Sequence, residues 1–266
     1  MNTSKKLYKS FRKSKLRDNL VIFYHKYRKI KNRGLFDSIE IETTTECNRK
    51  CSFCPNSKYD RGNHLMDENI YYTLIDSLKL HNFKGSLSPH FYGEPLLDPR
   101  LPKFLRYTRN NLKKCLIKIH TNGDFLDKDM LDILAPYVDV FVVSIYDDEP
   151  KIEENKNITF KKLDGIDISN RGGVISNKES VYHPVRCFLP MSHLVIDWKG
   201  NVILCCHDYF SSAVFGNIKF DDVYDIWSKP FFSKARSNIA NGIFDFDICK
   251  KCKFKSSNNW SAILDK

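Results

Sequence analysis

The order of strands and helices over residues 38–164 limits this chain to a small number of folds. Strand-like segments at 38–44, 86–95, 115–123, 139–147 and 157–165 alternate with helix-like segments at 66–80, 101–111 and 127–137. Strands that alternate with helices pair in parallel, and the helices form the crossovers. A sheet or barrel of this kind carries its chemistry at the carboxyl ends of its strands.

The last crossover of this pattern is too short to contain a helix. Only the charged stretch 147–156 separates the fourth strand-like segment from the fifth. A parallel crossover normally needs a dozen or more residues. The sequence therefore predicts an α/β fold in the form of an abridged, partial β/α barrel.

A different pattern begins near residue 183. The stretch 193–208 is typical of a β-hairpin that turns at Lys199–Gly200, and 221–242 is typical of a helix that ends at Gly242. We therefore expect three parts, which are a basic amphipathic extension (1–34), the partial barrel (35–182) and a small hairpin-plus-helix module (183–266).

The positive charge is concentrated in the extension. Residues 1–34 contain twelve lysines or arginines and one acid, which accounts for the net charge of +11. Apolar residues recur there at helical spacing, which indicates either packing on the body or docking on an anionic membrane surface. Because the rest of the chain is balanced in charge, we expect no nucleic-acid partner.

The cellular location follows from the absence of a convincing targeting segment. The longest apolar run near the start, Leu20–Tyr24, is too short for a signal peptide or a membrane span. We expect a cytoplasmic protein, with peripheral membrane association through residues 1–34 as an alternative. In a reducing compartment, nine cysteines indicate metal binding or chemistry rather than disulfides.

Three of these cysteines follow the first predicted strand. Cys47, Cys51 and Cys54 have the spacing CX3CX2C. Three thiolates leave one iron of a cubane cluster uncoordinated, and an open metal position can bind a cofactor or substrate.

This motif resembles the signature of the radical S-adenosylmethionine (SAM) superfamily. In that family an electron from a 4Fe-4S cluster cleaves SAM, and the 5′-deoxyadenosyl radical takes a hydrogen atom from the substrate. The resemblance implies cofactor-binding roles for an aromatic residue near adenine, for the GEP element that holds the methionine, and for residues that contact the ribose or carboxylate. These are Phe53, then Gly93, Glu94 and Pro95, then Asn122 and Ser144.

The remaining cysteines form a second set. Cys187, Cys205, Cys249 and Cys252 have spacings that resemble twitch, an abridged SPASM domain with one auxiliary 4Fe-4S cluster. Four protein ligands would close such a cluster, so it suits electron transfer rather than SAM binding. A structural zinc site has the same four-cysteine pattern and stays open as an alternative.

Further segments, including SNRGG at 169–173 and GNIKFDDVYDIW at 216–227, resemble superfamily members that oxidise a secondary alcohol on a sugar-like ring to a ketone. The resemblance implies SAM, two 4Fe-4S clusters, a flavodoxin- or ferredoxin-type reductant, and a small polar substrate such as a sugar, aminocyclitol or nucleotide-sugar. The auxiliary cluster would accept the second electron. Arg171 is the catalytic candidate near the substrate hydroxyl, where a permanent cation would stabilise an alkoxide. The alternative interpretation of RGG is an anion-binding or turn-forming loop.

Other functions remain open at this point. A radical SAM epimerase of a sugar or peptide-derived substrate would return hydrogen from a thiol, for which Cys206 is the candidate. A peptide-modifying SPASM enzyme usually has an N-terminal peptide-binding domain, and residues 1–34 are too short for one. A non-enzymatic iron–sulfur protein would not explain the GEP and TNG motifs. His90 and His120 flank these motifs, either as substrate contacts or as structural histidines.

Overall fold

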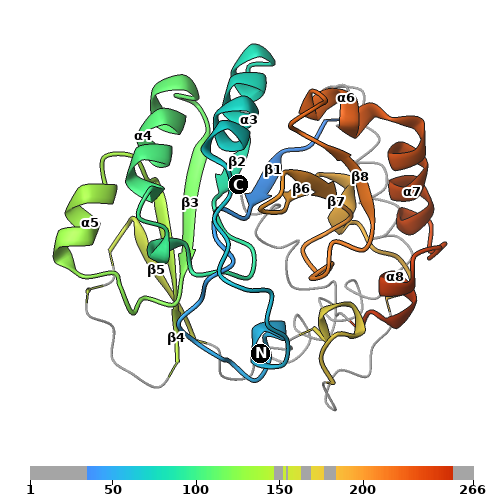
Figure 1. Ribbon diagram of the computed structural model, residues 1–266, viewed down its shortest axis with the longest axis horizontal. Helices are drawn as coiled ribbons and strands as arrows, with labels where there is room; N and C mark the ends of the chain where they lie inside the picture. The colour runs from blue at the N-terminus through green and yellow to red at the C-terminus, as the bar shows by residue number, and fades with distance from the viewer. Residues whose placement is uncertain (1–34, 147–151, 154, 163–168, 177–183, 254–266) are drawn as a thin grey trace, which may run out of the picture. The chain divides into compact units, whose positions relative to one another are not determined.

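The computed structural model describes residues 35–146, 152–153, 155–162, 169–176 and 184–253 (Figure 1). Residues 37–255 form one compact unit. Its strands are β1 (Ser38–Ile41), β2 (Ser86–Ser88), β3 (Leu116–Thr121), β4 (Val140–Ile145), β5 (Ile158–Lys162), β6 (His193–Ile196), β7 (Asn201–Ile203) and β8 (Val214–Asn217). Its helices are α3 (Glu68–Leu80), α4 (Leu101–Asn111), α5 (Lys128–Leu134), α6 (Val223–Ser228), α7 (Pro230–Ala240) and α8 (Asp247–Lys251), with short 3-10 turns η1 (Pro55–Ser57), η2 (Pro95–Leu97), η3 (Arg171–Gly173) and η4 (Leu189–Met191).

The strands form one sheet in the order β5-β4-β3-β2-β1-β6-β7-β8. Neighbours from β5 to β6 run parallel, as the alternation of strands and helices predicts. The end strands β5 and β8 do not pair within the described residues, so the sheet does not close. The prediction of a partial barrel is confirmed. The stretch between β4 and β5 shows no helix in its described part, 152–153 and 155–157.

The helices form where capping residues precede apolar stripes. Asp67 caps α3 by accepting a hydrogen bond from the Asn69 backbone N–H at 2.9 Å, and Asp127 caps α5 in the same way. The stripe on α3 is buried, and Tyr71 of this stripe stacks on Phe104 of α4 with ring centroids 4.2 Å apart. Figure 1 shows α3, α4 and α5 beside β2–β5, and α6 and α7 beside β6–β8.

Side chains alternate across the parallel strands. Ile39 and Ile41 of β1 are at most 1% exposed, as are Ile117 and Ile119 of β3, and they form the core beneath the helices. The residues between them, such as Glu40 and His120, point to the opposite, inner face of the partial barrel. That inner face therefore carries ionisable side chains, which a purely structural sheet between apolar layers would not require.

The C-terminal module continues the sheet rather than standing apart from it. The predicted hairpin is confirmed, because β6 and β7 pair antiparallel on either side of Lys199–Gly200. In addition, β6 pairs in parallel with β1, which the sequence did not predict. The cysteine-bearing module is thereby held directly beside the strand that leads into the first cysteine loop.

The single helix predicted over 221–242 is wrong. The structure has two helices, α6 and α7, which meet at Lys229 and Pro230. Pro230 has no backbone N–H to continue α6, and it forces Lys229 into an extended conformation with φ −51° and ψ 133°. Gly242 ends the second helix with φ +84°, as predicted.

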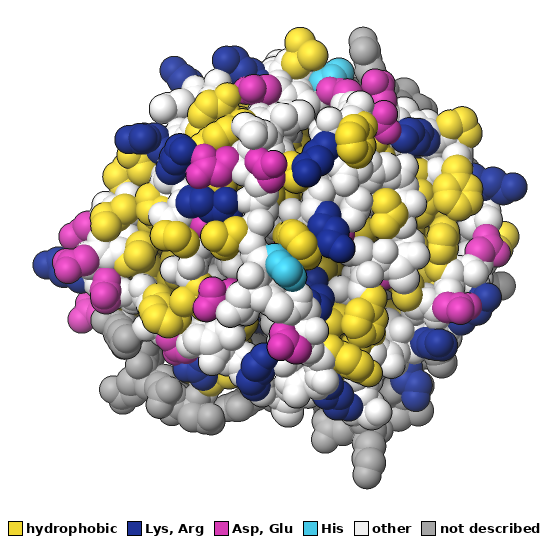
Figure 2. Space-filling model, in the orientation of Figure 1, with side chains coloured by type: hydrophobic (Ala, Val, Ile, Leu, Met, Phe, Trp, Pro, Cys, Tyr) yellow, Lys and Arg dark blue, Asp and Glu magenta, His cyan; other side chains and the backbone are white. Residues whose placement is uncertain are grey.

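The basic extension, residues 1–34, lies outside the described residues, and its predicted membrane or body contact stays a prediction. Among the described residues no helix has the length and apolarity needed to cross a membrane. On the face shown in Figure 2, basic and acidic side chains are interspersed.

Candidate active site

The first cysteine set lies on the loop that follows β1. Cys47, Cys51 and Cys54 are free, half-buried thiols. Burial, with smaller contributions from the nearby Glu94, Cys54 and Cys51, raises the pKa of Cys47 to about 11. No fourth cysteine joins them in the described residues. Three converging thiols are a donor set that suits a cubane cluster in which the fourth iron has no protein ligand.

The GEP element is packed directly against this loop. A Cβ atom on Gly93 would lie 2.1 Å from the Thr44 carbonyl oxygen, so only glycine fits there. The next residue, Glu94, donates its backbone N–H to the Glu46 carbonyl oxygen at 2.7 Å. Pro95 is buried and begins η2. The close approach of these backbones fixes the acid beside the first cysteine.

Glu94 also joins the ends of β2 and β3. Its side chain is 3% exposed and accepts hydrogen bonds from the Thr121 hydroxyl at 2.7 Å and the Asn122 backbone N–H at 2.8 Å. Burial raises the pKa of Glu94, and these donors oppose that rise. The GEP and TNG motifs therefore form one hydrogen-bonded unit, although 27 residues separate Glu94 from Thr121.

An aromatic and ionic network connects the cysteine loop to the segments that follow β3 and β4. Phe53 and Tyr146 are nearly parallel, with centroids 6.3 Å apart and planes at 8°. Arg49 lies over the Tyr146 ring at 4.3 Å and donates Nε to Asp124 at 2.7 Å. Sequence reasoning identified Phe53 but missed the other three residues. Their positions, just inside the cysteine motif and just after two strand ends, were the available signal.

The two other predicted SAM contacts differ in their surroundings. Asn122 donates its side-chain amide to Asn48 Oδ1 at 2.8 Å, which links the TNG turn to the cysteine loop. Ser144 lies on β4 opposite Lys161 of β5 and has no hydrogen bond to the other predicted residues in the described part of the chain. The structure thus brings Asn122, but not Ser144, into the network around Glu94.

The second cysteine set lines one pocket of the C-terminal module. Cys187, Cys205, Cys249 and Cys252 all face this pocket, together with His207. Cys249 lies on α8 and Cys252 directly follows it. Burial, then the neighbouring Cys187, raises the pKa of Cys249 and of Cys252 to about 12. Four thiols around one pocket, with Cys205 buried and the others half-buried, suit a closed iron–sulfur cluster or a zinc ion.

The SNRGG segment holds this second set in place. Asn170 donates its amide to the Lys251 carbonyl oxygen at 2.9 Å and accepts from the Lys253 backbone N–H at 2.7 Å. The backbone N–H of Gly172 hydrogen-bonds the Cys252 sulfur. Gly173 has φ +91°, and a Cβ there would lie 2.7 Å from that of Lys251. Both glycines are therefore explained by close packing on the CX2C segment.

Arg171 lies between the two cysteine sets. It has φ 50°, an uncommon conformation for a residue with a side chain. Its guanidinium is 5.7 Å from the Tyr92 ring centroid and interacts electrostatically with Cys206, Cys54 and Glu40. Its buried Nε atom has no hydrogen-bond partner among the described residues. A buried, unpaired donor at a strained position indicates a site built for a ligand.

Comparisons with known proteins give the same two units. A radical SAM superfamily model matches residues 41–178, which include the whole first set and the motifs joined to it. The chain belongs to the radical SAM superfamily. A SPASM model, described as an iron-sulfur cluster-binding domain, matches residues 187–253. The cofactors are therefore SAM and two iron–sulfur clusters, and the donor sets described above fit both clusters.

Individual relatives of this radical SAM enzyme cover most of its length. It is 33% identical to the S-adenosyl-L-methionine-dependent 2-deoxy-scyllo-inosamine dehydrogenase of Niallia circulans, over 82% of this chain and 93% of the relative. A solved structure of BtrN in complex with AdoMet and 2-DOIA has a TM-score of 0.77 and 31% identity, and covers 83% of this chain and 94% of its own. Native anSMEcpe with bound AdoMet, at 15% identity and a TM-score of 0.54 over 81% of this chain and 86% of its own, shares the fold.

The hydroxyl of Thr121 provides a test of the Glu94 unit. We expect Thr121→Val to destabilise the radical SAM enzyme by about 1.5 kcal/mol, because a buried carboxylate loses one charged hydrogen bond. SAM should also bind more weakly, since Glu94 is then less firmly oriented. Thermal unfolding and equilibrium dialysis with SAM measure both effects. Thr121→Ser keeps the hydroxyl and is the control. Equal values for the two variants would show that the hydrogen bond contributes nothing.

Proposed function

We propose that this enzyme oxidises a secondary alcohol of a sugar or aminocyclitol-like substrate to a ketone. The observation that carries the proposal is the likeness to the 2-deoxy-scyllo-inosamine dehydrogenase, which covers 82% of this chain and 93% of the relative. The bound SAM and clusters would supply hydrogen-atom removal from carbon and a one-electron acceptor. The chain's own residues would bind the substrate, orient it and accept a proton.

The geometry around Arg171 supports a substrate site between the two cysteine sets. Arg171 interacts electrostatically with Cys54 of the first set and with Cys252 of the second. A hydroxyl bound at its guanidinium would lie near both clusters. We propose that Arg171 stabilises negative charge that develops on the substrate oxygen, because its guanidinium stays protonated and does not accept a proton.

The remaining partners are proposals of the same kind. A flavodoxin- or ferredoxin-type protein would supply the electron that initiates SAM cleavage. The inner face carries histidines, a glutamate and an arginine beside valines such as Val142 and Val195, and these charged and polar groups favour a small polar substrate.

An epimerase is the second candidate, and one observation favours it. The Cys206 sulfur lies on the inner face, within 4.8 Å of side-chain atoms of Glu40 and His193. A free thiol there could return a hydrogen atom to a substrate carbon. Epimerisation would leave the oxidation state of the substrate unchanged and would need no electron acceptor.

The experiment that separates the two is product analysis in D2O. The holoenzyme, with SAM and a reductant, is given 2-deoxy-scyllo-inosamine and a panel of ring polyols and amino sugars. We expect one ketone for each 5′-deoxyadenosine and no solvent deuterium at carbon. An alcohol product with solvent deuterium at one carbon would instead establish epimerisation. No turnover across the panel would contradict the proposed substrate class.

A further inference from the structure

Four polar side chains form a row across the inner face of the partial barrel. We call His120, His90, Glu40 and His193 the inner row. His120 lies on β3, His90 just after β2, Glu40 on β1 and His193 on β6. These four strands are consecutive neighbours in the sheet. The row thus lies on the same inner face as Arg171, which interacts electrostatically with Glu40 and His90.

Glu40 lies between two histidines of this row. Its Oε1 atom is 3.3 Å from His193 Nε2 and 3.6 Å from His90 Nε2. The other ring nitrogen of His193 is also held, since its Nδ1 atom lies 2.7 Å from the Ser38 hydroxyl. A carboxylate that faces one nitrogen of an imidazole fixes the ring and its tautomer, as in catalytic dyads. The 3.6 Å separation is longer than a hydrogen bond, and such contacts often shorten when a ligand binds.

The far side of the His90 ring is unpaired. His90 Nδ1 is a buried atom with no hydrogen-bond partner among the described residues. The ring itself is held, because it stacks on His120 with centroids 4.4 Å apart. With Nε2–H directed at Glu40, the Nδ1 atom presents a lone pair. A buried, oriented and unpaired lone pair is a hydrogen-bond acceptor for which the described residues supply no donor.

Alcohol oxidation needs such an acceptor, since the hydroxyl proton must leave and Arg171 cannot take it. We propose that His90, held by Glu40 and His193, accepts the hydroxyl proton of the substrate. This inference rests on the proposed dehydrogenase function. Burial lowers the pKa of His90, as do His193 and Arg171, whereas Glu40 opposes them. The ring is therefore neutral, and able to accept a proton, at neutral pH.

The reaction balances with this assignment. The carbinol C–H bond would break, and bound SAM would supply the acceptor of its hydrogen atom. The O–H bond would break and its proton would move to His90 Nδ1. The remaining electron would go to the auxiliary cluster held by the second cysteine set, and a carbon–oxygen π bond would form. Glu40 and His193 touch neither reacting atom and are positioning residues.

A metal ion is the competing interpretation of these groups. Side-chain atoms of Glu40, His193 and Cys206 lie within 4.8 Å of one another. A cation there would lie close to the permanent charge of Arg171, which interacts with both Glu40 and Cys206. It would also compete with the ion pair that Glu40 already forms with His193. The row is therefore better suited to holding a proton than a second cation.

The test follows hydrogen and proton removal separately. The probe is 2-deoxy-scyllo-inosamine, or whichever panel compound the wild type oxidises, with deuterium at the carbinol carbon. We expect the His90→Asn variant still to transfer deuterium into 5′-deoxyadenosine. The ratio of ketone to 5′-deoxyadenosine should fall about 100-fold, which is the low end of the range of rate effects attributed to a general base. His64→Asn, an exposed histidine stacked on Trp198, is the matched control and should behave as wild type. An unchanged ketone yield in His90→Asn would overturn the role of His90 and leave the proposed function standing. A wild-type enzyme that oxidises none of the compounds would overturn both.

A second variant tests the positioning of His90. Glu40→Gln removes the carboxylate that raises the pKa of His90, so the acid limb of kcat/KM should move to lower pH. The groups that act on His90 besides Glu40 are His193, Arg171 and the stacked His120, and all stay in place. An unmoved limb would contradict the role of Glu40. One equivalent of zinc retained by the wild type and lost in Glu40→Gln and Cys206→Ser would show a metal site and overturn the proton-acceptor assignment.

Discussion

Replacing Cys47, Cys51 and Cys54 with alanine is expected to abolish SAM cleavage and to lower the iron content from about eight to about four per chain. The reason is that the first set provides three thiolates to one cluster, while the second set provides four to another. Iron, sulfide and zinc analysis after anaerobic reconstitution measures the loss. 5′-Deoxyadenosine formation under reducing conditions measures the activity.

The matched variant removes ligands of the second set. Cys249→Ala with Cys252→Ala should also lower iron to about four, yet it should leave SAM cleavage in place, because the loop after β1 is intact. Ketone formation should then be lost, because the enzyme has no electron acceptor. Four irons and one zinc in the wild type would contradict the auxiliary cluster, and the redox-neutral epimerase would become the better function.

The sequence predicted those parts of the fold that depend on local signals. The alternation of strands and helices, the short stretch 147–156 and the turn at Lys199–Gly200 each depend on neighbouring residues, and the structure has the parallel strands, the open sheet and the hairpin. The break at Pro230 was also a local signal, but the apolar pattern on either side of it was continuous enough to favour one helix. The pairing of β1 with β6 was not predictable, because nothing local distinguishes one parallel edge from another.

The candidate site was likewise predictable only where it depends on local signals. Motif spacing identified both cysteine sets. The requirement for glycine at position 93 comes from a close backbone contact, which spacing cannot show. The inner row could not be assembled from sequence, since Glu40 and His193 are 153 positions apart in the chain and meet only through strand pairing. One signal was available. An acid in the middle of a parallel strand is unusual, because such strands are normally covered on both faces.

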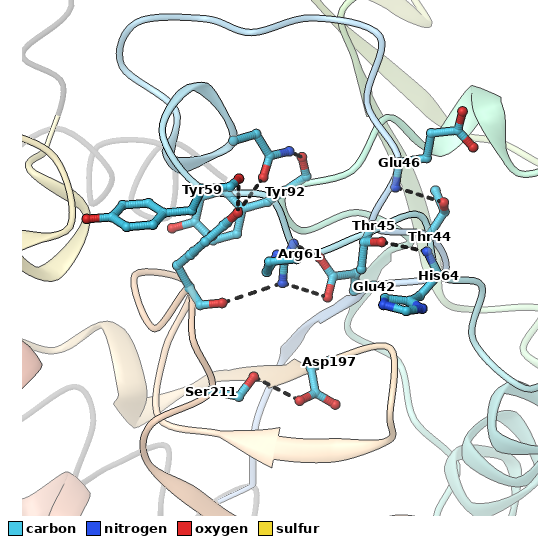
Figure 3. A network of polar contacts seen from close by, with 12 residues as sticks. Glu42, Thr44, Thr45, Glu46, Tyr59, Arg61, His64, Tyr92, Asp197 and Ser211 are labelled. Carbon is cyan, nitrogen blue, oxygen red and sulfur yellow. Dashed lines mark hydrogen bonds and ion pairs between the residues drawn. The ribbon is translucent and has the colours of Figure 1, made fainter.

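A second long-range contact, between Glu42 and Arg61, has a structural role. Glu42 directly follows β1 and its side chain is fully buried. Arg61 donates Nη2 to Glu42 Oε1 at 2.5 Å and Nη1 to Oε2 at 3.2 Å (Figure 3). The same guanidinium lies 4.3 Å from the ring centroid of Tyr209, in the segment after β7. Arg61 thus links the strand before the first cysteine set to the C-terminal module.

We expect Arg61→Ala to destabilise the holoenzyme by about 3–5 kcal/mol, because a buried carboxylate is left without its partner. For a unit of this size that corresponds to a fall in Tm of roughly 10 °C. Lys103→Ala is the control and should leave the Tm almost unchanged, since the ion pair of Lys103 with Glu68 is exposed and screened by solvent. Thermal unfolding of both reconstituted variants, under anaerobic conditions and at fixed SAM concentration, measures the difference.

The pH dependence of this loss distinguishes an unpaired charge from lost packing. Burial raises the pKa of Glu42, and Arg61 opposes that rise. Without Arg61 the pKa in the folded state rises further above the value in the unfolded chain. A carboxyl group whose pKa is raised in the folded state adds to the free energy of unfolding while it is protonated. This stabilisation is lost as pH rises through the folded-state pKa. The Tm deficit of Arg61→Ala should therefore be smallest at acidic pH, where Glu42 is protonated, and should grow as pH rises. A deficit that does not change with pH would mean that Arg61 acts through its packing on Tyr209 instead.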